Sequence, residues 1–109
     1  MDYSNFKKEI DYLCSRKDDS IFMSKKKYEQ AIDNFNTLII RVLRDYSLYA
    51  SNTPVEMKKI LEESVKRANL RFSSVEMLSL ASLNTLNASL AEYKKSIKKY
   101  AYRLCEDKE

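Results

Sequence analysis

The sequence predicts an all-α protein, an antiparallel up-down four-helix bundle with long second and fourth helices. Its 109 residues include no glycine and a single proline, Pro54. Glycine and proline are the usual turn residues, so all-β and α/β folds, which need many tight turns, are strongly disfavoured. Apolar residues recur at intervals of three and four, which is the helical period. We therefore expect one domain, residues 1–109, with a single modest core.

The first helix is predicted from about Ser4 to Arg16. One face of this segment carries the apolar residues Tyr3, Phe6, Ile10 and Leu13. Residues 17–20 form a polar break, and we expect the apolar residues 21–23 that follow to pack across the end of the bundle.

The second helix is predicted from about Ser24 to Tyr49. A seven-residue repeat runs through it, formed by Tyr28, Ile32, Phe35, Ile39, Val42, Tyr46 and Tyr49. Leu38 and Leu43 widen the apolar stripe, as expected for a helix in a bundle rather than in a two-stranded coiled coil.

The third helix begins at a strong start signal and extends to about Leu70. Thr53 is predicted to be the N-cap, Pro54 the first helical residue and Glu56 the closing residue of a capping box. The predicted buried face consists of Met57, Ile60, Leu61, Ser64, Val65 and Ala68.

The fourth helix is predicted from Ser73 to about Cys105, a length of roughly 50 Å at 1.5 Å per residue. Ser73 and Glu76 have the spacing of a capping box, and Phe72 and Met77 that of a hydrophobic staple. A second seven-residue repeat consists of Ser79, Leu83, Leu86, Leu90, Tyr93, Ile97, Tyr100 and Leu104. Because the two long helices both carry such repeats, we expect them to be neighbours. Depending on direction, either Tyr28 or the pair Tyr46 and Tyr49 would then lie near Tyr93 and Tyr100.

The residue types present argue against catalysis and metal binding. Histidine is absent, which removes the commonest general base and the commonest metal ligand. The two cysteines, Cys14 and Cys105, do not have the spacing of a zinc site, and we expect reduced, partly buried thiols. No pair of carboxylates has the pattern of a general acid and base. We predict a protein that is not an enzyme and that uses no cofactor and no metal.

The N-terminal segment lacks the apolar stretch of a signal peptide, and no segment approaches the ~18 apolar residues of a membrane span. We therefore expect a cytoplasmic protein, with contact to the membrane surface as a further option. The net charge of +4 favours anionic surfaces without requiring nucleic acid.

A basic and aromatic segment, residues 93–103, ends the fourth helix and contains no acidic residue. Its lysines Lys94, Lys95, Lys98 and Lys99 are predicted to cluster on one side, opposite the apolar stripe. One interpretation is a solvated helix end whose lysines complement the helix dipole. A second is a surface for an anionic membrane or a membrane protein, and a third, which we disfavour, is a nucleic-acid surface.

The segment from Leu70 to Leu86 carries a recognisable pattern. An aliphatic residue, any residue, an aromatic residue and a serine occupy positions 70–73, and Leu80, Ala81, Leu83 and Leu86 follow. This pattern resembles the junction of the third and fourth helices in immunity proteins for class IIa (pediocin-like) bacteriocins. The chain length, the basic charge and the four predicted helices agree with that family.

The resemblance implies a non-enzymatic cytosolic protein that gives resistance to an antimicrobial peptide. Such a protein would bind a mannose phosphotransferase permease that already holds the bacteriocin, and would block its pore. Specificity in the family maps largely to the C-terminal half, so the contact surface would lie on the third and fourth helices. Within it, physical chemistry selects seven candidate partner-binding residues: Lys94, Lys95, Lys98, Lys99, Tyr100, Tyr102 and Arg103.

A second class of function also fits the sequence, namely a helical adaptor, a chaperone or an oligomeric coiled-coil subunit. Glu76 is the only charged residue between Ser73 and Ala91. A helix that is apolar on most sides must be covered inside a bundle or by a partner.

Overall fold

The structure is a computed structural model that describes residues 3–16, 25–49, 53–71 and 80–106, with the side chains of 25, 64–71 and 80–86 left undescribed. The described residues form four helices and no strand. The helices are α1 (Ser4–Ser15), α2 (Lys25–Asp45), α3 (Val55–Arg71) and α4 (Leu80–Glu106). The predicted all-α fold with four helices is therefore confirmed.

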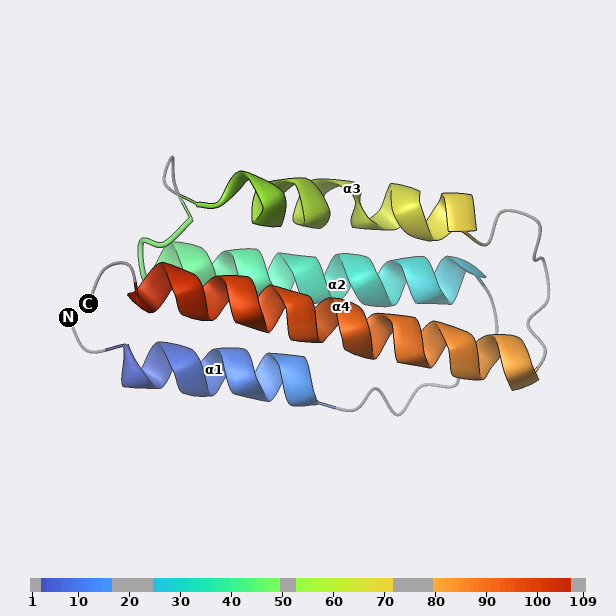
Figure 1. Ribbon diagram of the computed structural model, residues 1–109, viewed down its shortest axis with the longest axis horizontal. Helices are drawn as coiled ribbons and strands as arrows, with labels where there is room; N and C mark the ends of the chain where they lie inside the picture. The colour runs from blue at the N-terminus through green and yellow to red at the C-terminus, as the bar shows by residue number, and fades with distance from the viewer. Residues whose placement is uncertain (1–2, 17–24, 50–52, 72–79, 107–109) are drawn as a thin grey trace.

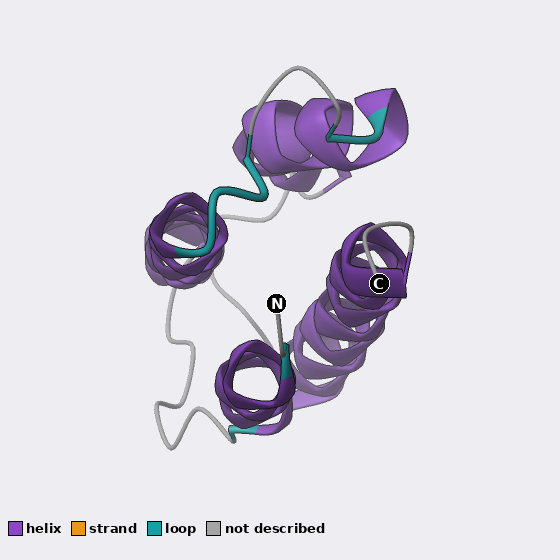
Figure 2. Cartoon of the chain, turned by 90° about the vertical axis from the view of Figure 1, so that its left-hand side faces the viewer, coloured by secondary structure: helices purple, strands orange, loops and turns teal. Residues whose placement is uncertain are grey.

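The four helices lie side by side along the long axis of a molecule that measures 47 × 25 × 17 Å (Figure 1). Helix α1 packs against both α2 and α4, and α3 packs against α2. Figure 2 shows α2 and α4 on opposite sides of the molecule, with α3 at the top and α1 at the bottom. The predicted contact between the second and fourth helices is present, but the contact between α1 and α4 is more extensive.

One hydrophobic core joins all four helices. Its fully buried large side chains are Phe6, Ile10, Ile39, Leu43, Leu48, Met57, Ile97 and Cys105. Of the predicted stripes, Phe6 and Ile10 of α1 and Ile97 and Leu104 of α4 lie in this core, and α4 adds Ala101 and Cys105, which lie outside its predicted repeat.

The buried stripe of α2 drifts away from the predicted seven-residue repeat. After Phe35 and Ile39 the fully buried residue is Leu43, whereas Val42 is only half-buried. A straight helix has 3.6 residues per turn, whereas a seven-residue repeat assumes 3.5. The residues that face the core therefore fall progressively later in the sequence than the repeat predicts.

Helix α2 ends at Asp45, four residues earlier than predicted, in a left-handed C-terminal turn. Ser47 has a φ of 57°, and the Leu48 N–H donates to the Leu43 carbonyl at 2.7 Å. The Ser47 N–H donates to the Arg44 carbonyl at 2.9 Å. These bonds form the Schellman arrangement, which normally uses glycine at the left-handed position. Because this chain has no glycine, the burial of Leu48 against Leu43 must offset the strain at Ser47.

The start of α3 also differs from the prediction, which made Pro54 the first helical residue. The helix begins at Val55, and Pro54 precedes it with its carbonyl accepting from the Lys58 N–H at 3.1 Å. The buried hydroxyl of Thr53, the predicted N-cap, donates to the Leu48 carbonyl at 2.9 Å and so ties the start of α3 to the end of α2.

Asn36 on α2 connects three helices through its amide group. Its side chain is 5% exposed, and its Nδ2 donates to the Leu61 carbonyl on α3 at 3.0 Å. The Tyr93 hydroxyl on α4 donates to the Asn36 Oδ1. Beside this bond, the rings of Phe35 and Tyr93 meet edge to face with centroids 5.7 Å apart. Tyr46 packs against α1, where its ring and that of Phe6 meet edge to face with centroids 5.3 Å apart. The tyrosine pairing expected from the two repeats stays a prediction.

Several predicted features lie outside the described residues. They are the capping box at Ser73 and Glu76, the staple of Phe72 and Met77, and the apolar segment 21–23. The side chains predicted to be buried at 64–68 and at 79–86 also belong to this part of the chain.

Replacing Asn36 with alanine should lower the free energy of unfolding by about 2 kcal/mol, because one buried and one part-buried hydrogen bond are lost. Tyr93→Phe removes only one of them and should cost about 1 kcal/mol. Urea denaturation followed by circular dichroism measures both. The matched control is Asn34→Ala on the exposed side of the same helix, which carries the same change in helix propensity. Equal effects at positions 34 and 36 would contradict the role of Asn36.

Candidate partner-binding surface

The seven candidate residues all lie on α4, and the helix divides them among three directions. Lys94, Lys98 and Tyr102 contact α1. Lys95, Lys99 and Arg103 are exposed, and Tyr100 is half-buried against the core. The prediction of one lysine cluster opposite the apolar stripe is therefore wrong, because 100° steps along the helix send Lys94 and Lys95 to different surroundings.

Lys94 is buried rather than solvated, with only 6% of its surface exposed. Its Nζ lies 3.4 Å from the carbonyl oxygen of Arg16 and 5.4 Å from the centroid of the Phe35 ring. The carbonyls at a helix C-terminus carry partial negative charge, and the aromatic face attracts a cation. Lys94 therefore serves to hold the end of α1 against α4.

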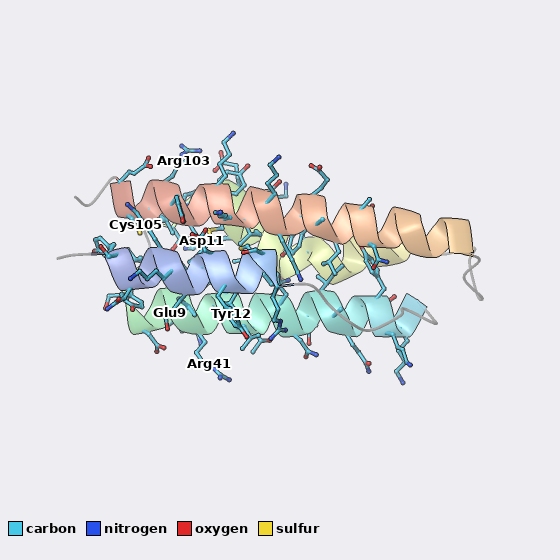
Figure 3. The ribbon with its side chains drawn as sticks, turned by 90° about the horizontal axis from the view of Figure 1, so that it is seen from below. Glu9, Asp11, Tyr12, Arg41, Arg103 and Cys105 are labelled. Carbon is cyan, nitrogen blue, oxygen red and sulfur yellow. The ribbon has the colours of Figure 1, made fainter. Side chains whose placement is uncertain are left out.

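Four residues, Lys7, Asp11, Lys98 and Tyr102, form a second polar contact between α1 and α4, here termed the Asp11 cluster. The Lys98 Nζ lies 2.6 Å from the Asp11 Oδ1, and the Tyr102 hydroxyl donates to the same oxygen at 2.9 Å. The ammonium groups of Lys7 and Lys98 lie 5.8 Å and 5.6 Å from the centroid of the Tyr102 ring. Figure 3 shows Asp11 at the junction of the two helices.

Within the Asp11 cluster, the pKa values of Asp11, Lys98 and Tyr102 are shifted. Hydrogen bonds from Lys98 and then Tyr102 lower the pKa of Asp11, and the bond to Asp11 raises the pKa of Lys98. The pKa of Tyr102 is raised, first by burial and then by its bond to Asp11. The side chains of Lys98 and Asp11 are 40% and 48% exposed, so solvent screens their attraction and the pair contributes less than about 1 kcal/mol.

Lys95, Lys99 and Arg103 form an exposed line on the outer side of α4, here termed the basic row. Their spacing of four residues gives a row about 12 Å long at 1.5 Å per residue. Figure 3 shows Arg103 on this outer side and Arg41 of α2 on the opposite side of the molecule. Glu92 and Glu106 lie near the two ends of the row. Within the described residues, no ion pair engages its three cations.

Both cysteines are free thiols, as predicted. Cys105 is fully buried, and Cys14 is half-buried beside a cleft of about 300 Å³ where the end of α1 meets α4. Burial raises the pKa of Cys14 to about 11. A thiol in this state is a poor nucleophile at neutral pH, because the thiolate is the reactive form.

The sequence alone did not identify the contribution of α1 to this surface. Lys7 and Asp11 lie one position beyond the apolar residues Phe6 and Ile10, which placed them at the edge of a helix face. That position marks side chains able to reach a neighbouring helix. It does not say which helix, because the partner depends on the tertiary arrangement.

Asp11→Asn should destabilise the protein slightly at pH 7, by less than about 1 kcal/mol. A carboxylate whose pKa is lowered by folding stabilises the native state above its unfolded pKa, about 3.9, and loses this effect as the pH falls through the folded pKa. The difference between wild type and variant should therefore vanish in acid, as measured by urea denaturation from pH 7 downward. Asp33→Asn, exposed on α2, is the control. A difference that stays constant with pH would show that the Asp11 carboxylate makes no ionic contribution.

The described residues contain no group of histidine, cysteine or acidic side chains that could hold a metal ion. In the same part of the chain, no helix is long and apolar enough to cross a membrane.

Comparison with known proteins gives no match: no family model, no curated protein and no solved structure matches this chain.

Proposed function

We propose that this protein is an immunity protein for class IIa (pediocin-like) bacteriocins, and that it protects the producer cell by binding rather than by catalysis. Its partner is the complex of a mannose phosphotransferase permease with the bacteriocin, reached from the cytosolic side. The protein is cytoplasmic in this proposal and uses no cofactor.

One observation carries the proposal, namely the segment from Leu70 to Leu86 and its position in the fold. Helix α3 ends at Arg71 and α4 is in place from Leu80, so the segment spans the junction of these two helices. The family pattern that it resembles belongs to the same junction. A cap at the start of the last long helix would fix where that helix begins. The C-terminal half would then present its binding residues on one rigid element.

The antiparallel up-down arrangement is part of the same proposal. Contacts between α1 and α4 run in opposite order along the two helices, because Lys7 meets Tyr102 and Arg16 meets Lys94. The path of the chain in Figure 1 agrees with this direction. In a bundle of this kind, α4 has one outer face that no other helix covers.

The basic row on that outer face is the proposed contact with the partner. Lys95, Lys99 and Arg103 are exposed and available, and half-buried Tyr100 lies beside them on α4. Lys94, Lys98 and Tyr102 act indirectly, because their contacts to α1 fix how α4 is rotated. The adaptor alternative depends on the apolar segment 73–91, whose side chains are described only from residue 87 onward, so no described contact favours it.

Expression in a sensitive host should protect the cells against one or a few pediocin-like peptides. Reversing the basic row with Lys95→Glu, Lys99→Glu and Arg103→Glu should abolish protection, because a surface that attracts acidic groups then repels them. Survival over a series of peptide concentrations measures the effect.

The matched control changes three exposed cations on α2 and α3 by the same charge: Lys26→Glu, Arg41→Glu and Lys59→Glu. It should protect as well as wild type. Unchanged sensitivity to every peptide, with folded wild-type protein present in the cells, would overturn the proposed function. Equal loss in both triple variants would overturn the proposed surface.

A further inference from the structure

We draw no further inference here: the strongest candidate, the cleft of about 300 Å³ where the end of α1 meets α4, carries no ligand site, because its buried Lys94 is already held by the Arg16 carbonyl, a single cysteine, Cys14, does not make a site, and nothing in the structure shows what covers the rest of its lining.

Discussion

The buried amide of Asn36 is the constraint on which the arrangement of three helices depends. It joins α2 to the Leu61 carbonyl of α3 and to the Tyr93 hydroxyl of α4, beside a core of apolar side chains. Apolar packing alone tolerates small rotations and slips between helices, whereas a buried amide must meet its partners in one register. The core supplies most of the favourable free energy, and Asn36 selects the arrangement in which that core forms.

The rotation of α4 follows from this constraint and sets the character of its surface. With Tyr93 turned toward α2, the next residue, Lys94, turns toward the end of α1, and Lys95 turns outward. Residues one and two turns later repeat the pattern, so Lys98 reaches Asp11 while Lys99 remains exposed. The part-buried hydrogen bond of Tyr93 and the contacts of Lys94 and Lys98 to α1 together separate lysines that hold the bundle together from lysines available to a partner.

The helices themselves could be predicted because their apolar periodicity and caps are local properties of the chain. The end of α2 could not be predicted, because the left-handed position is occupied by Ser47 and the glycine that normally marks such a turn is absent from the sequence. The burial of Lys94 was also missed, since a lysine in a basic run looks solvated until the neighbouring helix end is known. Asp11 shows the same limit, because its side chain is local to α1 but its partners Lys98 and Tyr102 are set by tertiary packing.

The most direct test of this account is the acylation rate of each lysine, measured by mass spectrometry on the folded protein and again in urea. The account predicts that Lys95 and Lys99 react rapidly in the folded protein, while Lys94, 6% exposed, reacts slowly until the chain unfolds. All three should react alike in urea, because the protection of Lys94 comes from the fold. Rapid reaction of Lys94 in the folded protein would contradict the rotation of α4, and with it the division of the lysines between the bundle and its partner.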